Sequence, residues 1–335
     1  DDSAATRLVA HGQVVQEETQ LALLAAELGF DVVWAAEHHF YDYSFCPDNV
    51  LWLAGIAAQA KNVDVGTAAV IMPWNEPLRV AEKITLLDHM TNGRVRFGMG
   101  RGLSKREFGH FRGIGMDESR ARFDEGSSMV VEALRTGFIE GNGPYYPQPR
   151  TEIRPRPERS FEGRTYAVAT SDDSVEAAAR LKAAMVLFAD RSWTARLPSI
   201  QRWRELYRNY HHAAPPPPLI CDFVYCHEDA EVAASRGQQY IATYLESVLE
   251  HYEIMGDHFK GMRGYESYAG ASGALKRMGE SGFLKGFLEA TAHGTPAQIL
   301  AKYRARRELL RRHSVSRRGP LDLRIRPKIK HRINP

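Results

Sequence analysis

Short apolar segments alternate with segments of helical periodicity along most of this chain, and the alternation restricts the fold more than any other feature. In the helix predicted over 16–28, leucine or alanine recurs every three or four residues and Gly29 follows its end. Strands that alternate with helices pair in parallel through right-handed crossovers. The pattern therefore predicts an α/β protein built on a parallel sheet. Its six strands are expected at 31–36, 63–72, 94–100, 163–170, 183–189 and 215–226.

The length of 335 residues suits either one large barrel or two ordinary domains. Six strand–helix units favour a (β/α)8 TIM-like barrel, although the count alone leaves an open doubly wound sheet as the alternative. Two longer inserts, at 137–159 and 258–282, interrupt the alternation. In a barrel, inserts at the carboxyl ends of the strands shape the active site.

The composition is that of a globular protein, with 44% apolar and 25% charged residues. No uninterrupted apolar run approaches the roughly 18 residues of a membrane span, and the first residues lack the order of a signal peptide. The three cysteines, Cys46, Cys221 and Cys226, form no CxxC motif, which argues against a disulfide framework or a zinc site. We therefore expect no membrane partner, no resident metal and a cytoplasmic location.

Positive charge is concentrated at the end of the chain. Residues 301–335 carry a net charge of +11, whereas the rest carries −8. A basic tail of this kind could contact an anionic surface, but a solvated chain end is the more common explanation. The body has no basic stripe interleaved with aromatic residues, so no nucleic-acid partner is expected.

The strand predicted over 31–36 ends at Glu37, His38 and His39. Adjacent side chains of a strand face opposite ways, so one histidine can face a chamber at the carboxyl end of the sheet while the other packs outward. A histidine there can exchange a proton near neutral pH. The alternatives are a hydrogen-bonded structural pair and a metal site, and the second lacks an obvious third ligand in the sequence.

Two further strand ends suggest an anion site. The stretch GMGRGL at 98–103 brings backbone close to a ligand and adds the guanidinium of Arg101. The stretch TSDDS at 170–174 precedes a helix, where free N–H groups and serine hydroxyls suit a phosphate, and Arg120 lies near the start of another helix. Taken one at a time, these motifs are equally explained by a tight turn and a helix cap.

Several stretches, in this order, resemble the bacterial luciferase-like flavin-dependent monooxygenase family, and the alkanal monooxygenase type most closely. The resemblance covers roughly residues 16–303. The matching stretches are AELGFDVVWAAEHHF at 26–40, VGTAAVIMPWNEPLRVAEKITLLDHMTNGRVRFGMGRG at 65–102, ESRARFDE at 118–125, EIRPRP at 152–157, GRTYAVATSDDS at 163–174 and GTPAQIL at 294–300.

The resemblance implies a (β/α)8 barrel that binds reduced FMN at the carboxyl ends of its strands. In the family the flavin reacts with O2 at C4a to give a peroxide, which oxidises an aldehyde, a ketone or a similar apolar organic substrate. His38 matches the family's histidine beside the flavin, and Glu37 precedes it as in the motif, so both are predicted as catalytic. Thr170 stands where luciferase has a glutamate, and Gly100 where it has a reactive cysteine. The implied cofactor-binding residues are Ala68, Ala69, at a non-prolyl cis peptide, Gly100, Arg101, Gly102, Leu103, Arg120, Thr170, Ser171 and Ser174.

The resemblance also implies a separate flavin reductase as the source of FMNH2, and a homodimer formed through the early helices. The family's first strand has no counterpart before the first helix, and the last strand is altered. We therefore expect a barrel over residues 1–312 that lacks or alters these strands, followed by a basic tail over 313–335. Two other functions remain open: a non-catalytic flavin-binding or partner subunit, and a deazaflavin (F420)-dependent oxidoreductase.

Overall fold

The computed structural model describes residues 2–312, and within this range it leaves out the side chains of residues 2–9, 267, 271 and 274–281. The basic tail predicted over 313–335 lies outside the described residues. Among the described residues, no helix is both long enough and apolar enough to cross a bilayer.

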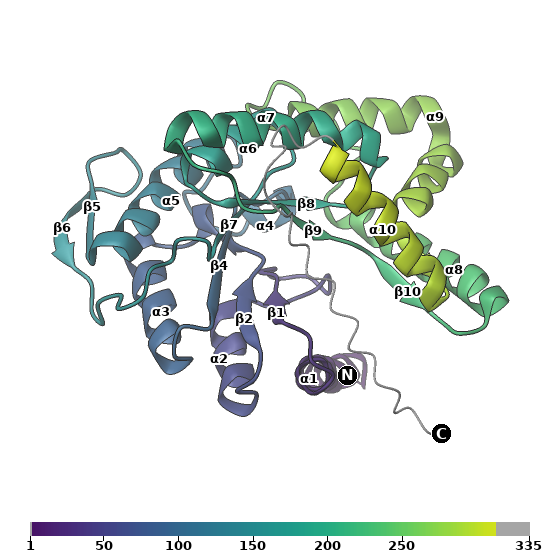
Figure 1. Cartoon of the computed structure of the whole chain (residues 1–335), viewed down its shortest axis with the longest axis horizontal. Helices are drawn as coiled ribbons and strands as arrows, with labels where there is room; N and C mark the ends of the chain where they lie inside the picture. Colours follow the sequence, from purple (N-terminus) through teal and green to yellow (C-terminus); the bar gives the residue numbers. More distant parts are fainter. Residues whose placement is uncertain (1, 313–335) are drawn as a thin grey trace.

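A curled parallel sheet forms the centre of the molecule, and its strand order is β1-β2-β4-β7-β8-β9 (Figure 1). Each consecutive pair is parallel, as the alternation of strands and helices predicts. Within the described residues the sheet does not close on itself, so the fold is an incomplete barrel with altered ends, as expected. The strands are β1 (Val32–Ala35), β2 (Asp64–Thr67), β4 (Val95–Gly100), β7 (Thr165–Val168), β8 (Ala184–Phe188) and β9 (Leu219–Cys221), and the short β3 (Val70–Ile71) pairs with β4.

Helices between the strands cover the outer face of this sheet (Figure 1). The helix α2 begins where Asp48 accepts a hydrogen bond from the backbone N–H of Leu51, a cap that offsets the unpaired amides of a helix start. The helix predicted over 16–28 is longer than expected and already begins at Asp2. The helices are α1 (Asp2–Glu27), α2 (Asn49–Gln59), α3 (Pro77–Met90), α4 (Lys105–Phe108), α5 (Ser119–Thr136), α6 (Asp172–Arg180) and α7 (Trp193–His211), with a 3-10 turn η1 (Met72–Trp74).

The last part of the chain departs from the regular alternation. The segment predicted as one strand over 215–226 is two strands, because β9 stays in the main sheet while β10 (Val224–Cys226) pairs with β11 (Ala292–Gly294). Between them, Asp222 forms an ion pair with Arg306 and Phe223 packs on Phe287, contacts that turn the chain away from the sheet. The helices α8 (Ala230–His251), α9 (Glu266–Ala290) and α10 (Pro296–Arg312) surround this small second sheet.

The two predicted inserts have different structures. Residues 137–159 contain an antiparallel hairpin of β5 (Phe138–Gly141) and β6 (Gln148–Glu152). Residues 258–282 lead into and form most of α9. The second insert therefore lies beside the carboxyl ends of β7 and β8, where it contributes to the cavities described below.

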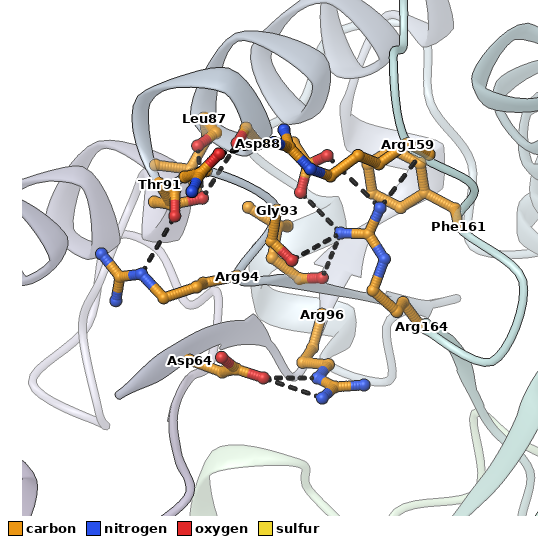
Figure 2. A network of polar contacts seen from close by, with 12 residues as sticks. Asp64, Leu87, Asp88, Thr91, Gly93, Arg94, Arg96, Arg159, Phe161 and Arg164 are labelled. Atoms are coloured by element: carbon orange, nitrogen blue, oxygen red, sulfur yellow. Dashed lines mark hydrogen bonds and ion pairs between the residues drawn. The ribbon is translucent and has the colours of Figure 1, made fainter. Parts of the chain in front are cut away.

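A network of charged side chains joins the opposite, amino-terminal ends of the strands (Figure 2). Arg164 donates to Asp88 at 2.5 Å and also to the carbonyl oxygens of Gly93 and Val95, and the Asp88 side chain is only 5% exposed. A buried ion pair of this kind costs about 3–5 kcal/mol when one partner is removed. The network therefore ties α3 to the starts of β4 and β7.

Candidate active site

A cavity of about 140 Å³ opens at the carboxyl ends of β1, β2, β4 and β7. This is the end of a parallel barrel at which ligands bind. Ser171 caps the adjacent helix α6 and is the one predicted residue that does not line the cavity. The predicted residues that do are Glu37, His38, Ala68, Ala69, Gly100, Arg101, Gly102, Leu103, Arg120, Thr170 and Ser174.

The chain makes an unusual turn between β2 and β3. The peptide bond joining Ala68 and Ala69 is cis, as the resemblance implied. Asn49 fixes the turn by donating from its side-chain amide to the carbonyl oxygens of Ala35 and Ala69, at 3.2 and 3.1 Å. This turn is the reason that the strand predicted over 63–72 is divided in two.

The carboxylate of Glu37 holds this turn through hydrogen bonds. Its carboxylate accepts from the backbone N–H of Ile71 at 2.8 Å and from the side-chain amide of Asn75 at 2.9 Å, and it lies 3.1 Å from Nε2 of His39. With these partners the carboxylate holds β3 and His39 in place. These contacts give Glu37 a positioning role, and a catalytic role for it stays a prediction.

His38 points to a different carboxylate. Its Nδ1 lies 3.2 Å from Oε1 of Glu107, a fully buried residue of α4, and His251 from the end of α8 lies 3.4 Å from Oε2 of the same group. The backbone N–H of His39 donates to Glu107 as well, at 2.6 Å. The two adjacent histidines thus face different partners, as the strand geometry predicts.

The protonation of this group follows from its contacts. Burial alone would raise the pKa of Glu107, but hydrogen bonds from His251 and His38 favour the charged form and lower the pKa to about 2. An ionised carboxylate can only accept hydrogen bonds, so a neutral His38 must carry its proton on Nδ1. Its Nε2 is then an acceptor, and the hydroxyl of Tyr252, 3.3 Å away, donates to it.

The nearest ligand atoms of His38, Glu107 and His251 lie within 4.8 Å of one another, and two imidazoles with a carboxylate could in principle hold a transition metal. The same atoms are already joined by hydrogen bonds, which explain their closeness without an ion. We therefore interpret the group as a carboxylate between two imidazoles.

Two arginines lie at another wall of the cavity. Arg101 donates to the carbonyl oxygen of Gly264 at 2.5 Å and stacks on Tyr265, while Arg120 donates to Asp124 at 3.0 Å. Nη1 of Arg101 and both Nε and Nη1 of Arg120 are buried without a hydrogen-bond partner in the structure. Burial, together with the charge of Arg101, lowers the pKa of Arg120 to about 10. Unpaired, buried guanidinium donors are suited to an anionic ligand.

The residues at the start of α6 hydrogen-bond to one another, whereas the anion-site prediction assumed that these groups were available to a ligand. Ser171 and Ser174 form a reciprocal cap, and Oγ of Ser174 accepts from the backbone N–H groups of Thr170 and Ser171 at 2.9 and 2.8 Å. The capping alternative therefore describes the hydrogen bonds present here. Ligand binding by these three residues stays a prediction.

Sequence reasoning missed Glu107, His251 and Tyr252. Glu107 is separated from His38 by 69 residues and lies on a helix of four residues, which gives no periodic signal. His251 and Tyr252 lie at the end of a long amphipathic helix, where they look like ordinary packing residues. Only the fold brings these residues to the end of β1.

The family model described as "Luciferase-like monooxygenase" matches residues 3–313. The alkanal monooxygenase alpha chain of Photorhabdus laumondii is 28% identical over 200 residues, which are 60% of this chain and 55% of that protein. This chain therefore spans little more than half the length of such curated relatives.

Solved structures show the same fold. The monooxygenase RslO1 from Streptomyces bottropensis has a TM-score of 0.62 and 30% identity, over 90% of this chain and 84% of that one. The oxygenating constituent of 3,6-diketocamphane monooxygenase from Pseudomonas putida, in complex with FMN, has a TM-score of 0.62 at 18% identity, over 88% and 83% of the two chains. The coenzyme F420-dependent tetrahydromethanopterin reductase from Methanopyrus kandleri has a TM-score of 0.61 at 16% identity, over 88% and 87%.

Proposed function

Because this chain belongs to the luciferase-like monooxygenase family, we propose that it is an FMN-dependent monooxygenase. It would use reduced FMN and O2 to oxidise an aldehyde, a ketone or a similar apolar organic substrate. One observation carries the proposal: the buried, unpaired donors of Arg101 and Arg120 line the same cavity as His38. An anion site and a proton-transfer group in one chamber are what a phosphorylated redox cofactor and its reaction require.

The residues present fit such a cofactor. Arg101 and Arg120 would hold the phosphate, because three of their nitrogens have no other partner. Gly102 has a φ of +84°, and a Cβ there would come within 3.1 Å of Ile71, Phe108 and Trp74, so this closely packed wall requires glycine. The cavity of about 140 Å³ is too small for the whole cofactor, but it meets a second cavity of about 790 Å³ that shares five of its lining residues. The two together are large enough.

When bound, a reduced flavin supplies the electrons and the atom at which O2 is activated. The protein's own contribution is to move a proton and to exclude water. His38 takes or gives a proton at Nε2, while Glu107 stabilises the imidazolium that forms. Apolar side chains from Leu103, Trp74 and Phe123 line the same cavity and limit the access of water.

The test is reconstitution with FMN, a flavin reductase, NADH and O2, followed by product analysis with decanal and a cyclic ketone. We expect oxygenated product from the wild type and a loss of at least about 100-fold in rate for His38→Ala, since a positioned proton donor contributes about that much. Full activity of His38→Ala would refute the assignment of His38. Failure of the wild type to bind FMN would refute the proposed function.

A second candidate, an F420-dependent oxidoreductase, is supported by fold neighbours that use this deazaflavin. Both cofactors carry a phosphate, so the arginines do not distinguish them. Reduced deazaflavins do not activate O2, whereas free FMNH2 consumes O2 even without protein, so formation of oxygenated product from FMNH2 and O2, not O2 uptake, separates the two. A non-catalytic flavin-binding subunit would bind FMN but would form no oxygenated product, so replacing His38 would change no rate of oxidation.

The proposal includes a homodimer and a cytoplasmic location. Leu51 on α2 and Leu86 and Met90 on α3 are exposed by 72%, 51% and 59%, which suits a surface covered by a second copy. All three cysteines are free, as in a reducing compartment. Sedimentation of the wild type and of Leu51→Glu tests the dimer, which the added charge should dissociate.

A further inference from the structure

The larger cavity, of about 790 Å³, lies between α8, α9, the end of β8 and the start of α7. Sites for drug-sized ligands have volumes of roughly 300–1,000 Å³, so this cavity is in the upper part of that range. A straight alkyl chain would leave much of it empty. The flavin of the proposed function would extend into part of this volume, and the space beside it suits a bulky ligand.

Nine of the residues that line this cavity are aromatic. The rings of Phe223 and Tyr244 are 4.6 Å apart and those of Phe223 and Phe287 are 5.3 Å apart, and all three residues line the cavity. Flat, polarisable rings pack well against other aromatic rings. The cation in the described lining, Arg191, is already paired with Asp190 at 3.2 Å. With this cation paired, the walls suit an aromatic ligand that carries no negative charge.

Tyr252 lies at the boundary, because it lines both cavities. When His38 is neutral and carries its proton on Nδ1, beside Glu107, the hydroxyl of Tyr252 can donate to Nε2 of His38. The oxygen of Tyr252 can then only accept a further hydrogen bond. A ligand hydroxyl can donate to it, whereas an aldehyde or ketone carbonyl cannot.

A second polar point is the indole of Trp193, which lines the same cavity and whose N–H is buried without a partner in the structure. It can donate to another oxygen of a ligand. Tyr43, Tyr244, Asp190 and Glu289 also line the cavity, so Tyr252 and Trp193 are two polar points among several, and together they can orient a ligand.

We propose that the larger cavity binds a bulky, neutral aromatic substrate that bears a hydroxyl group, and that Tyr252 connects this hydroxyl to His38. The inference rests on the proposed function, which supplies the flavin and O2. In the proton transfer, the substrate O–H bond breaks and its proton passes to the oxygen of Tyr252. The original Tyr252 proton passes to Nε2 of His38. The products are a phenolate and an imidazolium paired with Glu107, so atoms and charge balance.

Binding is the direct test, and it does not need turnover. Quenching of tryptophan fluorescence would give dissociation constants for 9-phenanthrol, for its methyl ether 9-methoxyphenanthrene, and for decanal. We expect 9-phenanthrol to bind most tightly to the wild type. Tyr252→Phe removes one hydrogen-bonding group. It should weaken the binding of 9-phenanthrol by about two- to tenfold and leave the binding of the ether unchanged.

A pair of glycine variants tests the location. Gly286 lines the cavity and Gly55 lies on the exterior of α2, and a Cβ at either would meet nothing within 4 Å. Gly286→Leu should fill the chamber and weaken both three-ring probes at least about tenfold, whereas Gly55→Leu should not. Equal weakening in both variants would overturn the location.

Two other results would overturn the assigned class: decanal binding more tightly than 9-phenanthrol, or identical binding of 9-phenanthrol to wild type and Tyr252→Phe. FMN binding, measured separately, distinguishes this inference from the proposed function. A protein that binds FMN and oxidises decanal but binds neither three-ring probe keeps its function and refutes the inference. A protein that binds 9-phenanthrol through Tyr252 but does not bind FMN supports the inference about the cavity and refutes the proposed function.

Discussion

Replacing Glu107 with glutamine should remove a large pH-dependent part of the folding free energy. In the folded protein the pKa of Glu107 is lowered from 4.5 to about 2, because hydrogen bonds from His251 and His38 outweigh the effect of burial. Each pKa unit corresponds to about 1.4 kcal/mol, so the shift contributes on the order of 3 kcal/mol. The Glu107 side chain is completely buried, so solvent screening does not reduce this value.

The direction in which stability changes with pH follows from the linkage between folding and protonation of Glu107. A carboxylate whose pKa is depressed by folding stabilises the folded state above its unfolded pKa, and the stabilisation is lost as pH falls through the folded pKa. For Glu107 the loss falls between about pH 4.5 and pH 2. The wild type should therefore lose about 3 kcal/mol more than Glu107→Gln over this range, because glutamine does not titrate.

The assay is urea unfolding of both proteins at closely spaced pH values from 7 down to 2, with the exposed Glu140→Gln as the matched control. At pH 7 the variant should be less stable by a similar amount, since a buried hydrogen-bonded network is broken. The two stability curves should converge as pH falls. A stability difference that stays constant from pH 7 to pH 2 would refute the ionised state of Glu107, and with it the proton position assigned to His38.

Three other substitutions test the site and the frame that holds it. Arg120→Met should weaken FMN binding by about 10- to 100-fold, the effect of removing charged donors, and isothermal titration checks this. Gly98→Ala should destabilise the protein by about 1–3 kcal/mol or more, because its Cβ would lie 2.1 Å from the carbonyl oxygen of Thr67; thermal unfolding measures it. Arg164→Met should cost about 3–5 kcal/mol by leaving Asp88 buried without its partner, while FMN affinity is retained in the folded fraction.

The sequence predicted the parallel strands well because their signal is local. Each is a short, largely apolar segment with a helix further along the chain, and all six contribute a strand to the main sheet. The predictions fail where contacts between residues far apart in the sequence determine where a strand ends. The segment over 215–226 is divided because Asp222 pairs with Arg306, 84 residues away. The segment over 63–72 is divided at Ala68–Ala69, where Asn49 holds the backbone.

The same distinction holds for the site. Residues at strand ends, such as His38 and Arg101, could be predicted, because a parallel sheet brings its carboxyl ends together. The partner of His38 could not. Glu107 lies on a short helix and His251 a further 144 residues along, so neither the choice of carboxylate nor its second imidazole has a local signature. Tyr252 was missed for the same reason.

Arginines at the two ends of the sheet differ in how far their donors are used, and this difference indicates where the chemistry lies. At the amino-terminal end, Arg164 donates to Asp88 and to several carbonyl oxygens, so its guanidinium already has hydrogen-bond partners within the protein (Figure 2). At the carboxyl end, Arg101 and Arg120 keep buried nitrogens without partners. Leaving such donors unpaired costs free energy, about 1–3 kcal/mol for each group. A ligand that supplies the missing acceptors would recover this free energy on binding, which supports the proposal that an anionic cofactor binds at the carboxyl end.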